Sequence, residues 1–242
     1  MIKRIVILTG AGVSAESGVP TFRGPEGLWE GHRVEDVATP EAFRRDPRLV
    51  QTFYDQRRAA LARVEPNPAH HALARLDAGW PRNDGHDLLL VTQNVDDLHE
   101  RAGSKRVLHM HGELKSAWCS ACDSRTPFEG TLLDGPACPV CSARGTLRPD
   151  IVWFGEMPYH MPRIDNALAS ADLFISIGTS GNVYPAAGFV DQAREAGAHT
   201  LELNLDPSMA SARFAQSRLG PAGALVPALV DDLLGTVTAA SD

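Results

Sequence analysis

Four cysteines occur as two C-x-x-C pairs, Cys119 with Cys122 and Cys138 with Cys141, separated by residues 123–137. Each pair can turn two thiolates toward one ion, and two pairs at this spacing are typical of a tetrahedral zinc ribbon. A site of four thiolates has no open coordination position, so we expect one structural Zn²⁺ and no catalytic metal. The alternatives are a redox-active pair or unmodified thiols.

A glycine-rich loop from Gly10 to Gly18 follows an apolar run and is a candidate ligand site. Its start fits G-x-G-x-x-[G/A], in which glycines allow a tight turn and bring backbone N–H groups against a pyrophosphate. A dehydrogenase motif would continue through a helix to a second strand that ends in an acidic residue. Residues 20–29 are instead irregular in pattern, which favours a mobile loop over a dinucleotide and disfavours hydride transfer.

Polar residues at the ends of two other apolar runs could also do chemistry. His109 and His111 share a face if they lie on a strand, so their spacing does not choose a general base between them. Gln93, Asn94 and Asp96 follow a run whose end would lie at the ligand-binding edge of an α/β sheet, although Asn and Asp are also frequent in turns.

The elements that must position these residues alternate between two kinds. Near-continuous apolar runs predict strands buried on both faces, at Ile5–Leu8, Leu88–Thr92, Val107–Met110, Leu173–Ile177 and Thr200–Leu205. Helical patterns lie between several of them, at Pro47–Val64, Pro68–Leu76, Pro162–Ala169 and Tyr184–Ala196. The sequence therefore predicts an α/β fold, a Rossmann-like doubly wound parallel sheet.

Two segments interrupt this alternation and define the expected organisation of a single domain over residues 1–242. Thr21–Pro40 shows little periodicity, and Ser116–Pro149 has too few aliphatic residues to fold by burial alone. We expect a Rossmann-like core of approximately residues 1–20, 81–112 and 150–242. A helical and loop segment (21–80) would cover the cofactor, and a small zinc-ribbon insertion would occupy 113–149.

Composition excludes several classes of protein. The chain has 242 residues, is 43% hydrophobic and 22% charged, and carries a net charge of −7. This acidic balance argues against a broad nucleic-acid or anionic-lipid surface, and no apolar run approaches the ~18 residues that span a bilayer. The short apolar start indicates a first core strand and not a signal peptide, so we expect a cytoplasmic protein with reduced cysteines.

Several motifs taken together resemble the sirtuins, the NAD-dependent protein-lysine deacylases, and most closely their bacterial CobB type, which is grouped with deacylases that accept acidic acyl groups. The matching segments cover residues 8 to about 222. In chain order they are Gly10–Arg23, Thr92–Asp96, His109–Glu113, the four cysteines, Val152–Glu156, Gly178–Ser180 and Asn204–Asp206.

The resemblance implies a reaction in which the acyl-lysine amide oxygen attacks C1′ of the nicotinamide ribose and nicotinamide leaves. His111, in the His-Gly-Glu motif, is then the general base toward a ribose hydroxyl, a role that suits a histidine pKa of about 6.5. His109 is left to packing or hydrogen bonding. The products are free lysine, nicotinamide and O-acyl-ADP-ribose.

The resemblance also implies the residues that bind NAD, the consumed co-substrate. Asn94 and Asp96 would line the ribose and nicotinamide pocket, and Ala222 would meet the adenine. The full set is Gly10, Ala11, Gly12, Ser14, Ala15, Glu16, Thr21, Phe22, Arg23, Trp29, Gln93, Asn94, Asp96, His111, Gly178, Thr179, Ser180, Asn204, Leu205, Asp206 and Ala222.

Acyl-lysine proteins or peptides are the implied substrates. The extended pattern of Val152, Phe154, Gly155 and Glu156 could accept a peptide as an added strand, or it could be an ordinary buried strand. No dedicated nucleic-acid or membrane partner is expected. The oligomeric state is open, with a monomer as one option.

Acyl preference is a separate prediction. Tyr54 and Arg57 share a helix face, and a guanidinium with a phenol can bind the carboxylate of succinyl, malonyl or glutaryl lysine. Without the resemblance, a solvated face is the ordinary interpretation of Arg57 and its neighbour. The Tyr-x-x-Arg spacing matches the acidic-acyl sirtuins, and Ala38 matches their small pocket residue, so we expect a desuccinylase that retains deacetylation. The alternatives are a protein mono-ADP-ribosyltransferase on the same scaffold and a non-catalytic NAD-sensing module.

Overall fold

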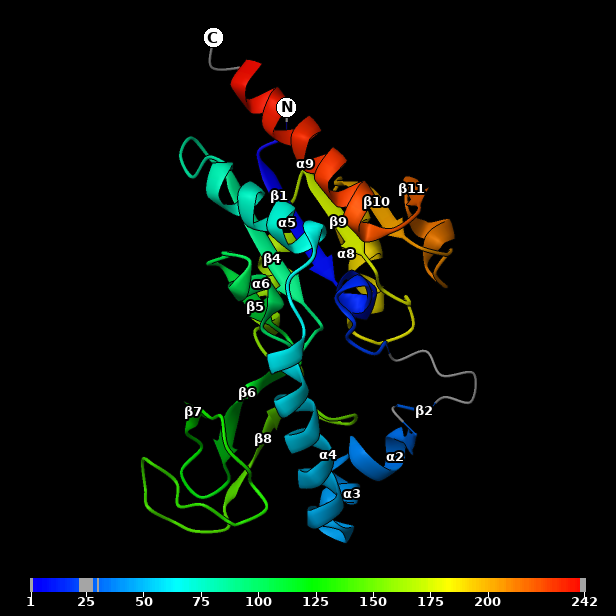
Figure 1. Cartoon of the computed structure of the whole chain (residues 1–242). Helices are drawn as coiled ribbons and strands as arrows, with labels where there is room; N and C mark the ends of the chain where they lie inside the picture. Colours follow the sequence, from blue (N-terminus) through cyan, green and yellow to red (C-terminus); the bar gives the residue numbers. More distant parts are fainter. Residues whose placement is uncertain (1, 22–27, 30, 240–242) are drawn as a thin grey trace.

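The computed structural model of the chain describes residues 2–21, 28–29 and 31–239. Figure 1 shows an upper unit built on a sheet, from which both termini emerge, and a lower unit that contains α4 and several short strands. No helix among the described residues is both long enough and apolar enough to cross a membrane.

Six parallel strands form the sheet of the upper unit, in the order β11-β10-β9-β1-β4-β5. Their bounds are β1 (Arg4–Thr9), β4 (Asp87–Thr92), β5 (Val107–His109), β9 (Leu173–Ile177), β10 (His199–Asn204) and β11 (Gln216–Leu219). β1 is central, with Ile5 in register with both Leu88 and Leu173. The predicted Rossmann-like parallel sheet is therefore confirmed.

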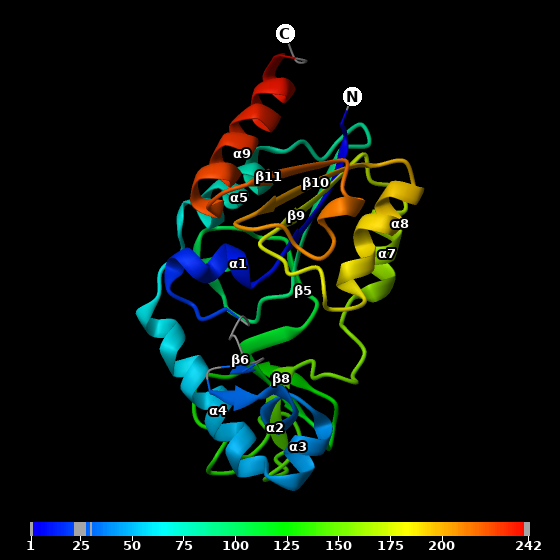
Figure 2. The same ribbon diagram turned by 90° about the vertical axis from the view of Figure 1, so that its right-hand side faces the viewer.

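Helices cover both faces of this sheet (Figure 2). On one face α5 (Pro68–Gly79) and α9 (Ala222–Ala239) pack against Ile5 and Ile7, whereas on the other α7 (Met161–Leu168) and α8 (Phe189–Glu195) pack with Val6 and Leu8. Successive residues of a strand point to opposite faces, which explains why an unbroken apolar run is needed. Two short helices, α1 (Ala11–Ser14) and α6 (Leu98–Arg101), follow β1 and β4.

The lower unit combines an antiparallel sheet, in the order β7-β6-β8, with three helices. The bounds are β6 (Gly112–Cys119), β7 (Arg125–Pro127), β8 (Leu147–Ile151), α2 (Val34–Val37), α3 (Pro40–Arg45) and α4 (Pro47–Ala60). Leu114 of β6 and Ile151 of β8 share a core with Phe53 and Tyr54 of α4. The helices and the antiparallel sheet therefore pack against each other as two layers with a shared core.

Local capping explains where the helices of residues 39–79 begin. Thr39, Asp46 and Asn67 each accept a hydrogen bond from a backbone N–H of the first turn, and each is followed by a proline. Such side chains satisfy the unpaired donors at a helix start, and proline lacks the donor that would be unpaired there. These signals are in the sequence, and the expected helices from 47 and 68 are confirmed.

Several elements differ from the sequence-based expectation. β11 has mostly exposed, polar residues, so an apolar run does not reveal it. α9 contains Gly223 and Pro227, which weaken a helix prediction, yet its apolar residues pack in the sheet core. The segment Thr21–Pro40, expected to be irregular, contains the hairpin β2 (Leu28–Trp29) and β3 (His32–Arg33) and also α2.

α5 lies inside the segment 21–80 that we expect to cover the cofactor, but its buried side chains belong to the core of the parallel sheet. Ala69, Leu73 and Leu76 pack there with Leu229 and Leu233 of α9. We therefore propose residues 68–79 as part of the Rossmann-like core; the other boundaries remain predictions.

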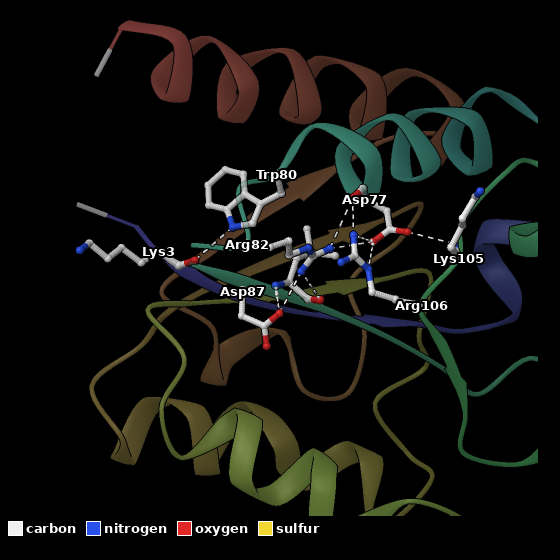
Figure 3. A network of polar contacts seen from close by, with 8 residues as sticks. Lys3, Asp77, Trp80, Arg82, Asp87, Lys105 and Arg106 are labelled. Atoms are coloured by element: carbon white, nitrogen blue, oxygen red, sulfur yellow. Dashed lines mark hydrogen bonds and ion pairs between the residues drawn. The ribbon is translucent and has the colours of Figure 1, made fainter. Parts of the chain in front are cut away.

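An ion network ties α5 to the sheet at the amino ends of the strands (Figure 3). Buried Asp77 accepts from Arg82 Nη2 at 2.8 Å, from Arg106 Nε at 3.0 Å and from the Lys105 backbone at 2.9 Å. A buried carboxylate is stable only when paired in this way. The network therefore orients α5, whose first turn lies near the opposite, carboxyl edge.

Candidate active site

The carboxyl ends of β1 and β9 meet where the sheet order reverses, since β4 and β5 lie on one side of β1 and β9 to β11 on the other. Such switch points are the usual ligand sites of open α/β sheets. The two loops are bound to each other: Gly10 N donates to Ile177 O and Gly12 N to Gly178 O, each at 2.9 Å.

This contact gives a physical reason for the glycines. A Cβ on Gly12 would lie 2.6 Å from Gly178 Cα, and Gly178 itself has φ +64° and would clash with Gly12 in turn. A Cβ on Gly10 would lie 2.8 Å from the Gly178 carbonyl oxygen. The glycines are therefore required first for the close packing of the two loops, which brings the expected residues of both loops to one place.

Three polar side chains expected to bind NAD form one buried cluster. Ser14 Oγ donates to Asp96 Oδ2 at 3.0 Å and accepts from Asn94 Nδ2 at 3.0 Å. Burial raises the pKa of Asp96, while bonds from Leu98 N and Ser14 oppose that rise. The structure thus brings together residues from the β1 and β4 loops, as expected from their positions at strand ends.

Two buried histidines that are not among the expected site residues support this cluster. His70 Nε2 lies 3.4 Å from Ser14 Oγ, and His99 Nε2 lies 3.0 Å from Thr9 Oγ1, with the two rings 4.9 Å apart. Burial lowers the pKa of His70 to about 4 and that of His99 well below its ordinary value, so both are neutral. The capping sequence from Asn67 to His70 is a signal that could have indicated the first of them.

His109 and His111, whose spacing alone does not choose a general base, have different environments. His109 is buried, with Nδ1 3.0 Å from Asn94 O and Nε2 2.8 Å from Glu100 Oε1. Burial lowers the pKa of His109, but Glu100 more than compensates and the net shift is upward. Both of its ring nitrogens are therefore occupied, which fits the hydrogen-bonding role expected of it.

His111 is half-buried and keeps one ring nitrogen without a hydrogen bond to the described residues. Its Nδ1 lies 3.2 Å from the Gln93 carbonyl oxygen. A carbonyl only accepts, so Nδ1 carries the proton and Nε2 the lone pair. Burial lowers the pKa of His111, and the Gln93 carbonyl partly opposes this. The result is a neutral imidazole with a free base at Nε2.

A cleft lies between the segment after β1, the end of α4, the loop after β4 and strand β6, with an empty volume of about 410 Å³ including the part open to solvent. Arg57 and Asp96 are its charged lining residues, beside apolar Pro20, Val95 and Leu114. The Arg57 guanidinium stacks over Trp29 at 4.1 Å and lies 5.2 Å from the Phe53 ring. The expected Arg57 and Asp96 therefore line one cavity.

Tyr54, expected beside Arg57, is fully buried and is not among the residues that line this cleft. Its phenol oxygen accepts from Trp153 Nε1 at 3.0 Å, and burial raises its pKa strongly, so it stays protonated. Ala38 is also buried in the lower core, and its carbonyl accepts from Phe154 N at 3.0 Å. Neither residue lines the cleft.

The segment Val152–Glu156 does not form the expected extended strand. β8 ends at Ile151, and a turn follows in which Glu156 Oε2 accepts from Trp153 N and from Arg148 Nη2, each at 2.9 Å. Trp153 is buried core, whereas Phe154 is 46% exposed. Glu156, expected to touch substrate, closes this turn, and Gly155 allows it with φ +91°.

Residues expected at the adenosine end lie at the carboxyl ends of β9 and β10. Asn204 Nδ2 donates to Thr179 O at 2.7 Å, which fixes the β9 loop, whereas Leu205 and Asp206 are exposed. Glu16 Oε1 accepts from Gly223 N at 2.8 Å at the start of α9, beside Ala222. A carboxylate is favoured at a helix start.

The remaining expected residues are placed as follows. Ala11, Thr21, Trp29, Gln93 and Ser180 are half-buried, and Ala15 is exposed. Phe22 and Arg23 lie outside the described residues.

The four cysteine sulfurs lie within 4.8 Å of one another. Cys119 and Cys141 are 3.8 Å apart, as are Cys122 and Cys138. Tetrahedral geometry with Zn–S bonds of about 2.3 Å places the sulfurs about 3.8 Å apart. The four thiols therefore fit a zinc ion, as the two C-x-x-C pairs predict.

The sheet order, the glycine contact at its switch point and the four-cysteine unit define a Rossmann-like protein with a structural metal site. A model of the Sir2 family matches residues 10–185. The chain belongs to this family, which confirms the resemblance.

Relatives and solved structures agree with this assignment. An NAD-dependent protein deacylase of Vibrio vulnificus (strain YJ016) is 55% identical over 234 residues, 96% of this chain and 94% of the relative. A Sir2 homologue in complex with NAD aligns with a TM-score of 0.86 at 39% identity, covering 97% of this chain and 91% of the other. A mutant Sir2 protein with a deacetylated p53 peptide and 3′-O-acetyl ADP-ribose aligns at 0.80 and 27% identity, covering 96% and 94%.

Proposed function

We propose that this chain is an NAD-dependent protein-lysine deacylase that gives nicotinamide, free lysine and O-acyl-ADP-ribose. The observation that carries the proposal is the state of His111: Nδ1 is held by the Gln93 carbonyl, and Nε2 makes no hydrogen bond to any residue that the structure describes. Bound NAD supplies the ribose carbon that takes up the acyl-lysine oxygen as nicotinamide leaves. Protein and peptide acyl-lysines are the substrates, and a cytoplasmic location remains part of the proposal.

The residues present fit a dinucleotide at the switch point. The loops of β1 and β9 are held together by glycine contacts, and the Ser14, Asn94 and Asp96 cluster offers amide, hydroxyl and carboxylate groups to a carboxamide and a ribose. Asn204 and Thr179 fix the neighbouring loop, where phosphates and the second ribose would lie. We propose that these residues bind and orient NAD.

His111 is proposed as the general base. The Gln93 carbonyl fixes its tautomer, so Nε2 can accept a proton from a ribose hydroxyl without a change of ring orientation. Its lowered pKa keeps the base neutral at physiological pH. His109, bound to Glu100 and Asn94 O, is proposed to hold the Asn94 loop.

An acidic acyl group is the proposed preference, with acetyl also accepted. Arg57 places a buried cation in the cleft, stacked on Trp29, where a carboxylate could form charge-assisted hydrogen bonds. The Tyr54 oxygen accepts from Trp153, so the phenol proton remains to be donated to a ligand. The Trp29 and Phe53 rings pack around Tyr54, and these two side chains would have to move for the acyl carboxylate to reach the phenol.

The zinc ion would be held by Cys119, Cys122, Cys138 and Cys141, and it would stabilise the lower unit without touching the reaction. The core around the cysteines is small, with Ala117, Leu132 and Leu147 as its aliphatic members. Such a core needs a metal staple.

The test is incubation of the zinc-loaded protein with NAD and matched acetyl- and succinyl-lysine peptides, read by mass spectrometry. We expect deacylated peptide and nicotinamide in equal amounts, loss of both in His111→Ala, and selective loss of succinyl turnover in Arg57→Met. His199→Ala, at an exposed histidine, is the matched control. ADP-ribose found on protein instead of deacylated peptide would replace the proposal with mono-ADP-ribosylation, and NAD binding without cleavage would indicate a sensing module.

A further inference from the structure

Arg57 and Arg58 are adjacent on α4, but their side chains lie in different environments. Arg57 lines the cleft, whereas the Arg58 side chain is 4% exposed and lies against the cysteine-bearing unit. Arg58 is not among the expected site residues, and a solvated face is the ordinary expectation for two adjacent arginines on a helix. Its burial therefore needs a separate explanation.

Arg58 bonds to three acceptors that belong to three segments. Its Nε donates to Leu114 O of β6 at 2.6 Å, and its Nη1 donates to Asp55 Oδ1 at 2.5 Å and to Gly130 O at 3.0 Å. Asp55 in turn accepts, at Oδ2, from Thr131 Oγ1 at 2.6 Å and from Leu132 N at 2.9 Å. The Asp55–Arg58 pair thus binds α4 to residues 130–132 and to β6.

Leu114 is the link to the cleft. The register of β6 against β8 shifts between Glu113 and Ala117, so the ladder leaves Leu114 O to a side-chain donor. Leu114 N donates to Val95 O at 2.8 Å, and both residues line the cleft with Arg57. The backbone of Leu114 is therefore held between Arg58 on one side and the Asn94–Asp96 loop on the other.

We propose that Asp55 and Arg58 are positioning residues for acyl selectivity: they fix the wall of the cleft at Leu114 and the turn of α4 that presents Arg57. The cysteine-bearing unit thereby acts on acyl preference through residues 130–132. This inference rests on the proposed acidic-acyl activity. A carboxylate that must meet Arg57 in a fixed geometry depends on this wall more than a small acetyl group does.

The variants must keep the fold. Arg58→Met would leave Asp55 without its cation and would leave Leu114 O and Gly130 O without their donor, which destabilises. Asp55→Asn keeps shape and one acceptor, and Thr131→Val removes the hydroxyl that donates to Asp55 and accepts from Leu133 N at 3.2 Å. Thr52→Val is the matched control, because the Thr52 hydroxyl donates only to Arg48 O of its own helix, at 2.8 Å.

The experiment measures kcat and KM for acetyl- and succinyl-lysine peptides of one sequence, with zinc content and melting temperature. Loss of one charge-assisted hydrogen bond corresponds to about a tenfold change in a binding constant. We expect the succinyl KM to rise about tenfold in Asp55→Asn and about threefold in Thr131→Val, with acetyl KM changed less than about twofold and Thr52→Val like wild type. Amide exchange at Leu114, which does not depend on turnover, should be faster in Asp55→Asn.

Equal losses for both peptides, or no loss in either variant, would overturn the inference, because a merely structural role does not discriminate between acyl groups. The Arg57→Met variant distinguishes a failure of the inference about Asp55 and Arg58 from a failure of the proposed function. If Arg57→Met loses succinyl turnover selectively and Asp55→Asn does not, the inference is wrong and the proposed function stands. If folded wild-type protein deacylates neither peptide, the proposed function is wrong.

Discussion

The phenol oxygen of Tyr54 accepts a hydrogen bond of 3.0 Å from the indole N–H of Trp153. This bond joins α4 to the turn after β8, so the helix that carries Arg57 and the turn that includes Phe154 share one buried contact. Its two partners come from distant parts of the chain. The Tyr-x-x-Arg spacing singles out Tyr54, but it does not indicate that Trp153 is its partner.

Tyr54→Phe should leave Trp153 Nε1 without its acceptor. A buried unpaired donor costs about 1–3 kcal/mol, so we expect a free energy of unfolding lower by about 1–2 kcal/mol in urea denaturation. Succinyl KM should rise more than acetyl KM, since the hydroxyl is also the proposed donor to the acyl carboxylate. Unchanged stability would show that Trp153 finds another partner. Phe43→Leu, on a neighbouring ring of the same core, is the control for packing loss.

The pH dependence of kcat/KM should reflect His111. Its pKa is lowered by burial, so the neutral base persists below the ordinary histidine range, and activity should be lost only below about pH 6.5. A pH profile with the acetyl peptide and saturating NAD checks this. An acid limb centred well above pH 7 would contradict the assigned environment. His111→Ala should lower the rate of deacylation by a factor of at least about a hundred.

His70 should make stability depend on pH. Its folded pKa of about 4 lies below the unfolded value of about 6.5, so the unfolded state binds the extra proton between these values. Stability is therefore fully present above about pH 6.5 and falls as pH decreases, by about 2 kcal/mol between about pH 7 and pH 5 from this group. Urea unfolding at both pH values measures this contribution in wild type and in His70→Gln, with His199→Gln at an exposed histidine as the control. Equal pH dependence in wild type and His70→Gln would contradict this account.

Gly12→Ala should disrupt the contact between the β1 and β9 loops. The new Cβ would lie 2.6 Å from Gly178 Cα, so one loop must shift, at a cost of about 1–3 kcal/mol. NAD affinity should fall in the same variant because both loops belong to the proposed site. Gly235→Ala in α9 is the control: a Cβ added there would meet nothing within 4 Å outside the helix's own backbone, and the change should stabilise by about 0.5–1 kcal/mol. Unchanged melting and NAD binding in Gly12→Ala would refute the tight-packing explanation.

The predicted strands and helices agree with the structure where hydrophobic burial and capping act locally. The predicted strand Leu173–Ile177 coincides with β9, because all its residues are buried and Ser176 is the one polar residue in an otherwise apolar run. β11 could not be predicted, since an edge strand of exposed polar residues has no apolar pattern. The Val152–Glu156 turn was missed because it depends on Arg148 and on the packing of Trp153.

The sequence by itself determined the parallel sheet, the four thiols of the metal site and the set of strand-end residues, because periodicity, C-x-x-C spacing and strand ends are local properties. The spacing of His109 and His111 does not choose between them, and the His-Gly-Glu motif selects His111 through the resemblance. The tertiary structure adds their different environments, since Gln93 O and Glu100 approach from other segments. The same reason applies to Arg58, whose acceptors lie on β6 and in residues 130–132. Long-range partners of a polar side chain are fixed by how the chain packs, and no local pattern records them.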